Sequence, residues 1–313
     1  MTRLLVTAIS GNVATGILRS LAGYDYRLYG CDVGEYPAGM DLVSDWFRVP
    51  YAVDEAYVPS LLRECEKREI RTVIPANEWE LLILDKHREE FAAAGIRLIM
   101  NGSFVLNTCM DKLVCMKELE KIGVPVPKSA RPEELAPGDG DYILKPCFGC
   151  GSKFLKRVGS AEEARREEEA FGSALVAQEY LPEEEGEYTM AVFSDGSAAR
   201  CIEFRRKLSH GYSAFVELVH RPEMEALGAL VAEKWKLRGS INLQMRVKNG
   251  VPHVFEINPR LSGTSHFRAM LGFNDAMWWC ETALGRPLPA YVPLYTEAIG
   301  IRETVEKFVL KRP

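Results

Sequence analysis

The sequence predicts an α/β domain built on a parallel sheet, followed by an α+β region that includes a smaller subdomain. Up to about residue 103, short apolar strands alternate with helices, which is typical of a parallel sheet covered on both faces. From about residue 141 onward the pattern is mostly strands. With 313 residues, 47% hydrophobic and 27% charged, the chain is long enough for two or three globular domains.

The α/β region is expected to contain four strands, at residues 3–9, 26–32, 71–76 and 96–101. The turn from Gly11 to Gly16 leads into the first helix, and further helices are expected at 57–68 and 78–94. That turn, with Asp32, is similar to a dinucleotide fingerprint, but its glycines lack the G-x-G-x-x-G spacing. A nicotinamide site is therefore the weaker reading of this turn.

The α+β region opens with a helix over residues 107–122, for which Asn107 or Thr108 is the expected N-cap and Gly123 the stop. The V-P-V-P segment then forces extended chain. Later helices are expected near residues 161–170, 222–236 and 264–284. The strands that we expect between them are 141–146, 174–181, 188–194, 199–208, 241–248 and 251–258.

Charge and hydropathy exclude several classes of protein. The net charge is −5, and no Lys/Arg stripe with interleaved aromatic residues is present, so nucleic acid is not an expected partner. The longest apolar runs are too short to span a bilayer, and the first residues do not resemble a signal peptide. We therefore expect a cytoplasmic protein without a membrane partner.

The eight cysteines are scattered, and only Cys147 and Cys150 form a C-x-x-C pair. Without a second pair or a histidine pair at metal spacing, packing is favoured over a zinc or redox role. Trp278 and Trp279 lie on a helical pattern and indicate either a buried core or the contact of a homodimer.

Two neighbouring strands carry polar side chains at alternate positions. Because side chains alternate across a strand, Glu256 and Asn258 should share one face, and Phe255 and Ile257 the other. The preceding strand contributes Asn242 and Gln244 to the polar face.

Asn249-Gly250 marks the hairpin between these strands. A two-residue loop would place Gln244 opposite Phe255 and mix the polar and apolar rows. We therefore predict a three-residue loop, or a bulge at Gly250, that restores polar against polar.

The oxygen atoms of Gln244, Glu256 and Asn258 are ligands that suit Mg²⁺. The alternative is a polar strand face that simply meets solvent. A second motif, I-L-K-P-C-F-G-C-G-S, ends a strand in Lys145 and continues into a glycine-rich turn. Gly149 and Gly151, with Ser152, would let backbone N–H groups approach phosphate, although the spacing is not that of a Walker A loop.

Taken in order, these segments resemble the ATP-grasp superfamily of carboxylate–amine ligases, in particular the synthetase domains of carbamoyl phosphate synthase and the pyrrolysine-pathway ligase. The resemblance rests chiefly on N-L-Q (242–244) followed by E-I-N-P-R (256–260), and on D-K (111–112) opening a helix that ends in G-V-P-V-P. It departs from many relatives at Phe154 after the glycine loop, and at Gln244, where several relatives have an acid although the carbamoyl phosphate synthase type also has glutamine.

The resemblance implies an ATP-grasp fold with a pre-ATP-grasp domain at residues 1–103, a small lid at 104–185 and a catalytic subdomain at 186–313. ATP and Mg²⁺ would be bound, with Mn²⁺ as an alternative metal. Lys112 and Lys145 would hold phosphates, and Glu187 the ribose. The adenine would be read by the hinge residues Gln178, Glu179, Tyr180 and Leu181.

The implied reaction joins a small carboxylate to an amine through an acyl phosphate, with Arg260 and Lys145 acting on the transferring group. For the substrates, the sequence offers Asn77 and Glu78 after the third strand, and Arg205 and His210 further along. The alternatives are a carbamoyl-phosphate-synthase-like enzyme that phosphorylates bicarbonate or carbamate, and a non-catalytic ATP-binding regulator.

Overall fold

The computed structural model describes residues 1–149, 154–303, 305–306 and 308. The predicted Gly151 and Ser152 contacts, and Cys150, lie outside these residues. The chain forms two compact units, which are described separately. The N-terminal unit comprises Met1–Met100, Lys207–Glu217 and Leu261–Pro313, and the central unit comprises Asn101–Arg206 and Leu218–Arg260. The division into three parts predicted from the sequence stays a prediction.

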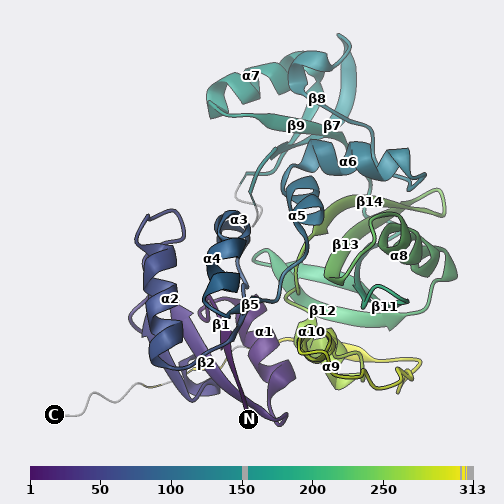
Figure 1. Cartoon of the computed structure of the whole chain (residues 1–313). Helices are drawn as coiled ribbons and strands as arrows, with labels where there is room; N and C mark the ends of the chain where they lie inside the picture. Colours follow the sequence, from purple (N-terminus) through teal and green to yellow (C-terminus); the bar gives the residue numbers. More distant parts are fainter. Residues whose placement is uncertain (150–153, 304, 307, 309–313) are drawn as a thin grey trace. The chain divides into compact units, whose positions relative to one another are not determined.

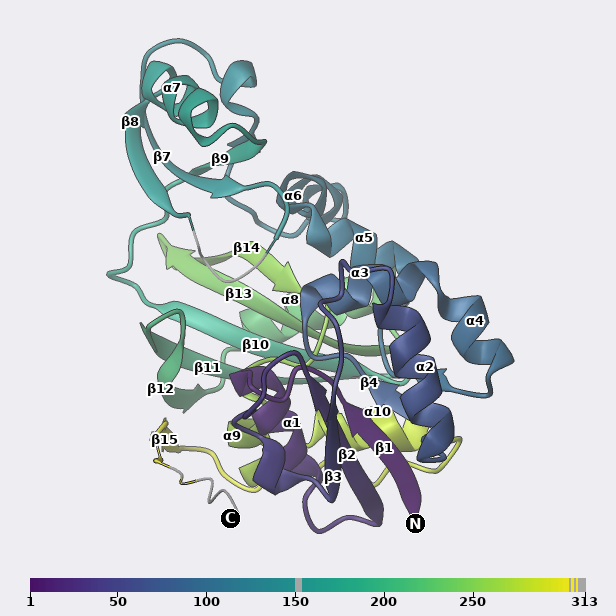
Figure 2. The same ribbon diagram turned by 90° about the vertical axis from the view of Figure 1, so that its left-hand side faces the viewer.

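The N-terminal unit is built on a parallel sheet with the strand order β3-β2-β1-β4-β5, and Figure 2 labels the first four of these strands. The predicted α/β class is thus confirmed. β3 was missed by the sequence analysis because it has only four residues and a single buried side chain, Phe47. The strands are β1 (Thr2–Val6), β2 (Tyr26–Asp32), β3 (Asp45–Arg48), β4 (Thr72–Ile74) and β5 (Arg97–Leu98).

Helices of the N-terminal unit are shorter than the sequence pattern indicated. The expected helix over 78–94 breaks at His87, whose φ of −110° and ψ of 17° are not helical, and the one over 264–284 breaks around Gly272, at φ +88°. Trp278 is buried against Phe273, which favours the core reading of the tryptophan pair. The helices are α1 (Asn12–Leu21), η1 (Met40–Leu42), α2 (Tyr57–Lys67), α3 (Glu78–Lys86), α4 (Arg88–Ala93), α9 (Ser265–Met270) and α10 (Asp275–Ala283).

The central unit begins with two helices where the sequence predicted one, α5 (Ser103–Met110) and α6 (Lys112–Lys121). The predicted caps at Asn107 or Thr108 are wrong. Asp111 separates the helices and caps α6, because its Oδ1 accepts hydrogen bonds from the N–H groups of Leu113 (2.9 Å) and Val114 (3.1 Å). Lys112 is consequently the first residue of α6.

A small antiparallel sheet with the order β6-β9-β7-β8 follows, and Figure 1 shows α7 lying along it. Ala164 of α7 packs into a core with Leu144 and Leu175. Phe154 packs against Phe171 of α7, with ring centroids 4.5 Å apart. Its elements are β6 (Ser129–Ala130), η2 (Pro132–Glu134), β7 (Asp139–Pro146), β8 (Lys156–Ser160), α7 (Ala161–Phe171) and β9 (Leu175–Glu179).

The larger sheet is antiparallel, with the order β14-β13-β10-β11-β12-β15. One face of its first three strands forms the core of the central unit with α8. No helix of the described residues is both long and apolar enough to cross a membrane. The elements are β10 (Glu187–Ser194), β11 (Ala199–Ser209), β12 (Tyr212–Val219), α8 (Pro222–Lys234), β13 (Gly239–Lys248), β14 (Val251–Asn258) and β15 (Ile299–Ile301).

The hairpin between β13 and β14 corrects the predicted loop. Lys248 pairs with Val251, so the turn has only two residues, and Asn249 and Gly250 both have positive φ, 53° and 76°. A bulge does occur, but it lies within the strands, where the register shifts between Gln244 and Met245. The predicted bulge at Gly250 is therefore wrong in position, although a bulge is indeed what sets the register.

The turn yields a stability prediction. Gly250→Ala should lower the free energy of unfolding by about 1 kcal/mol, because a side chain at φ +76° is strained even where space is open. Denaturant unfolding measures the change. Gly159→Ala is the matched control, since its φ is not positive and its new Cβ meets only Glu163 Oε2, at 4.0 Å. An equal loss in both variants would contradict the assignment of the turn.

Candidate functional site

The polar row predicted on the hairpin is present. Gln244 pairs with Glu256, and Asn242 pairs with Asn258. The prediction that polar faces polar across β13 and β14 is confirmed.

The predicted face of Phe255 is wrong. Met245 pairs with Val254, so Phe255 is the extra residue of the bulge. Val254 and Ile257 both belong to the core of the central unit, which leaves Phe255 and Glu256 on the opposite, polar face. Strict alternation cannot anticipate this, because a single inserted residue changes the parity of every later position.

Phe255 joins the two sheets of the central unit. Its carbonyl accepts a hydrogen bond from Gln178 Nε2 on β9 at 3.4 Å. Lys145 Nζ lies 4.7 Å from the centroid of its ring, and the guanidinium of Arg246 lies 5.9 Å away. The ring is thus a surface shared by cations from β7 and β13.

Lys145 lies near the end of β7 and donates a hydrogen bond to Gln178 Oε1 at 2.7 Å. Burial lowers the pKa of its ammonium to about 8, and the positive charges of Lys112 and Arg246 act in the same direction. Glu256 and Glu187 act in the opposite direction. Lys112, Glu187 and Glu256, which were predicted as site residues from separate segments of the sequence, therefore all act on the amine of Lys145.

Glu187 is the first residue of β10, and two arginines hold its carboxylate. Arg206 donates to Oε1 at 3.0 and 2.8 Å, and Arg246 donates to Oε2 at 2.9 and 2.7 Å. Burial raises the pKa of this carboxyl, but Arg206 and Arg246 outweigh burial and hold the pKa below its usual range. Arg206 also donates to Gln244 Oε1 at 2.8 Å, which links Glu187 to the polar row.

Lys112 approaches the glycine loop. Its Nζ donates to the carbonyl of Gly149 at 2.7 Å, and its backbone N–H donates to the carbonyl of Cys147 at 3.0 Å. Gly149 has φ +102°, a conformation that favours glycine. The described start of the loop therefore lies at the N-terminus of α6, where the positive end of the helix dipole favours anions.

The hinge segment 178–181 leaves a single backbone donor for a ligand. The N–H groups of Glu179 and Tyr180 donate to the carbonyls of Lys128 and Asp141, both at 2.8 Å. Leu181 is buried, and within the described part of the chain its N–H has no acceptor, while its carbonyl accepts from Arg246 at 2.8 Å. A buried N–H without an acceptor suits an adenine edge.

The oxygen donors for a metal lie on β14. Among the described residues, the carboxylate of Glu256 makes no hydrogen bond or ion pair within the protein. Asn258 is buried, and its Oδ1 accepts a hydrogen bond from Arg260 Nη2 at 3.4 Å. The described residues contain no group of three His, Cys, Asp or Glu side chains able to hold a metal ion, so any site here combines one carboxylate with amide oxygens.

Four residues predicted as substrate contacts complete the set, one of them in the central unit. Arg205 pairs with Tyr188, a core residue, and so belongs to the face of β11 opposite Arg206. Asn77, Glu78 and His210 are in the N-terminal unit.

In the N-terminal unit, Asn77 follows β4 and caps α3 by accepting from the N–H of Trp79 at 2.8 Å. His210 is exposed at the β11–β12 turn, at φ +51°. Asp32 accepts backbone N–H groups from Ser10 (2.7 Å) and Gly34 (2.9 Å), which gives its carboxylate a structural role in the first turn.

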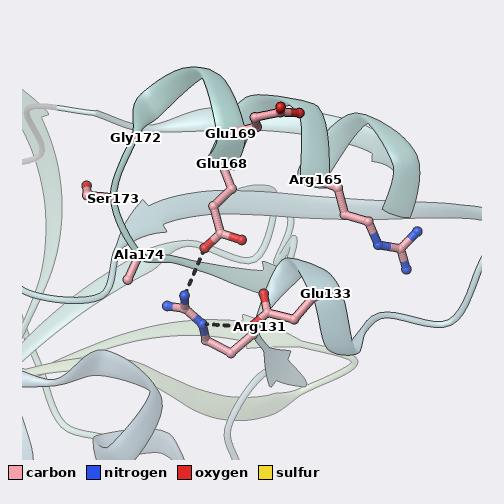
Figure 3. A pocket seen from close by; sticks show the side chains of 8 residues that line it. All are labelled: Arg131, Glu133, Arg165, Glu168, Glu169, Gly172, Ser173 and Ala174. Atoms are coloured by element: carbon pink, nitrogen blue, oxygen red, sulfur yellow. Dashed lines mark ion pairs between the residues drawn. The ribbon is translucent and has the colours of Figure 1, made fainter.

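A separate cavity of about 500 Å³ lies beside α7, and Figure 3 shows the side chains around it. Arg131 pairs with Glu168 there at 3.0 Å and also donates to Cys147 Sγ at 2.9 Å. Its lining residues are Arg131, Glu133, Arg165, Glu168, Glu169, Gly172, Ser173 and Ala174. None of the predicted site residues lines this cavity.

Comparison with known families gives two matches. Residues 109–264 match the ATP-grasp domain, and residues 12–99 match the PylC-like N-terminal domain. No curated protein matches the sequence significantly.

Solved structures share the fold. L-amino acid ligase from Bacillus licheniformis has a TM-score of 0.72 at 17% identity, over 91% of this chain and 74% of that one. N5-carboxyaminoimidazole synthetase from Staphylococcus aureus, complexed with ADP, has a TM-score of 0.74 at 14% identity, over 95% and 81%. The biotin carboxylase domain of Hydrogenobacter thermophilus 2-oxoglutarate carboxylase, with MgADP, ADP and bicarbonate, has a TM-score of 0.70 at 16% identity, over 92% and 71%.

Proposed function

Because residues 109–264 of this chain belong to the ATP-grasp domain family, we propose that the protein is an ATP-dependent carboxylate–amine ligase. It activates a carboxylate as an acyl phosphate and couples it to an amine, with release of ADP and phosphate. The observation that carries the proposal is the polar face of the bulged hairpin. There the carboxylate of Glu256, which has no hydrogen-bond or ion-pair partner among the described residues, interacts electrostatically with Lys145, whose Nζ lies over the ring of Phe255.

The nucleotide is proposed to lie between the two sheets of the central unit. Lys112 and Lys145 neutralise phosphate charge, together with the N–H groups of the glycine loop. The N–H of Leu181, which has no acceptor among the described residues, reads the adenine edge, Phe255 supports the base, and Glu187 accepts hydrogen bonds from the ribose hydroxyls. The three-part division at residues 103 and 185 is kept as part of this proposal.

The residues present fit a divalent cation. Glu256 is a carboxylate with no partner among the described residues, and Asn258 adds an amide oxygen beside it. Hard oxygen donors of this kind suit Mg²⁺, which takes most of its remaining ligands from water and phosphate. When bound, the ion would neutralise the charge on the phosphates.

The proposed reaction has two steps. An oxygen of the substrate carboxylate attacks the γ-phosphorus of ATP, and the bond from that phosphorus to the β–γ bridging oxygen breaks. The amine then attacks the acyl carbon, loses a proton, and phosphate leaves with the electron pair of the C–O bond. The protein positions the partners and stabilises charge, with Arg260, two residues after Asn258, acting on the transferring group.

A second candidate is an enzyme that phosphorylates bicarbonate. It is favoured by one observation, the similarity of the fold to a biotin carboxylase domain solved with MgADP and bicarbonate. In this second candidate the same residues hold the nucleotide, and bicarbonate takes the place of the organic carboxylate.

The release of ADP and phosphate from Mg-ATP tests both candidates. Purified protein is screened against amino acids and other carboxylates, singly and in pairs, and against bicarbonate. Release that needs two organic partners is the expected result. Release with bicarbonate alone would replace the ligase with the second candidate. Nucleotide binding without release under every condition would indicate a regulator.

The pKa of Lys145 predicts how nucleotide affinity depends on pH. Because burial lowers this pKa to about 8, the free protein loses the Lys145 charge as pH rises through 8, whereas bound phosphates favour the protonated amine. The Kd for an ATP analogue should therefore rise above pH 8, approaching tenfold per pH unit.

Calorimetry between about pH 6.5 and about 9.5 measures the Kd on both sides of the lowered pKa of Lys145. Lys145→Arg should flatten the profile, because arginine stays protonated throughout. A wild-type profile as flat as that of the variant would remove Lys145 from the phosphate site.

A further inference from the structure

Gln244, one of the predicted metal ligands, already has a cationic partner. Arg206 Nη2 donates to Gln244 Oε1 at 2.8 Å and to Glu187 Oε1 at the same distance. Its Nε donates to Glu187 Oε1 at 3.0 Å. The Arg206 side chain is only 8% exposed, so the guanidinium is fixed in the sheet face. A fixed positive charge thus stands beside the Gln244 oxygen.

Two neighbouring polar side chains, Asn242 and Glu187, also have protein donors for their oxygens. Asn242 Oδ1 accepts a hydrogen bond from Thr189 Oγ1 at 3.1 Å, and the Glu187 carboxylate is held by two arginines. Glu256 has no such partner among the described residues. Within the described part of the polar row, carboxylate charge for a metal is therefore available only on β14, and on β13 the oxygen of Gln244 is held by a guanidinium.

We infer that the guanidinium of Arg206 lies where a second divalent cation would lie next to Gln244, and that it supplies positive charge at that position. The nucleotide is therefore bound with one metal ion. This inference rests on the proposed nucleotide site. Enzymes of phosphoryl transfer often use two metal ions, which lie about 3.5–4 Å apart in two-metal sites. Here the amide of Gln244 provides no negative charge, and Arg206 repels a second cation while supplying a permanent positive charge of its own.

The number of Mn²⁺ ions bound per chain tests the inference without any measurement of turnover. Equilibrium dialysis with a saturating non-hydrolysable ATP analogue gives the count, and electron paramagnetic resonance reports whether two bound ions are coupled. The expected wild-type result is one ion and no coupling between ions. Two coupled ions in the wild-type protein would overturn the inference.

Variants identify the group responsible. Arg206→Met combined with Gln244→Glu should raise the count from one to two and introduce coupling, because the cation is removed and a carboxylate replaces the amide. Arg206→Lys combined with Gln244→Glu keeps a positive charge and should retain one ion. If the variant Arg206→Met, Gln244→Glu bound the analogue but still held one ion, Arg206 would not be the group that excludes the second ion.

Two controls separate this inference from the proposed function. Arg205→Met removes the neighbouring arginine on the opposite face of β11 and should leave the count at one. Glu256→Gln should reduce the count to zero. A count of zero in the wild-type protein would refute the proposed metal site together with the inference, whereas a count of two refutes only the role of Arg206.

Discussion

Glu256→Gln should lower the rate of ADP release by at least about 10²–10³-fold, the loss typical when a single charge-stabilising group is removed from an active site. The amide keeps the shape of the side chain but loses its charge. Among the described residues of this face no other carboxylate is available, because Gln244 is neutral and Glu187 is held by Arg206 and Arg246. Steady-state assays with saturating substrates measure the effect.

The fold should survive this change, since Glu256 has no hydrogen-bonding or ion-pair partner among the described residues. The unfolding midpoint is therefore expected to stay near the wild-type value. Glu233→Gln is a suitable control, because the Glu233 side chain on α8 is 72% exposed and forms an ion pair with its sequence neighbour Lys234. If Glu256→Gln released ADP at the same rate as this control, the assignment of the metal site would be wrong.

Arg260→Met should reduce kcat by about 10²–10³-fold, equivalent to a barrier higher by roughly 3–4 kcal/mol. Arg260 lies two residues after Asn258, and its Nη2 donates a hydrogen bond to Asn258 Oδ1 at 3.4 Å. It is therefore proposed to act where charge develops during transfer, and its loss should affect the rate and leave the Kd of the nucleotide unchanged.

The split between kcat and Kd is the decisive readout for Arg260. Arg260→Lys should fall between the wild-type protein and Arg260→Met, because lysine keeps the charge but not the two-pronged geometry. If Arg260→Met weakened nucleotide binding while kcat stayed unchanged, Arg260 would be a nucleotide contact with no part in transfer.

The components of the candidate site were predictable from the sequence because each sits in a distinctive local context. Lys145 ends an apolar strand before glycines, Asp111-Lys112 opens a helix, and Glu256 interrupts an apolar strand. The breaks in the long helices were less predictable. The helical spacing of apolar residues continues across His87 and Asp111, but the helices break at both residues. At His87 the backbone dihedral angles are not helical, and at Asp111 the side chain caps the next helix.

By itself the sequence determined the fold class and the identity of the polar residues, because hydrophobic periodicity and strand-end motifs are local properties of the chain. Only the tertiary structure decided how those residues combine. A bulge at Phe255 placed the ring on the polar face, and pairing across β10, β11 and β13 brought Arg206 to Gln244 and Glu187. Register and long-range ion pairs depend on contacts between distant segments, which no local pattern records.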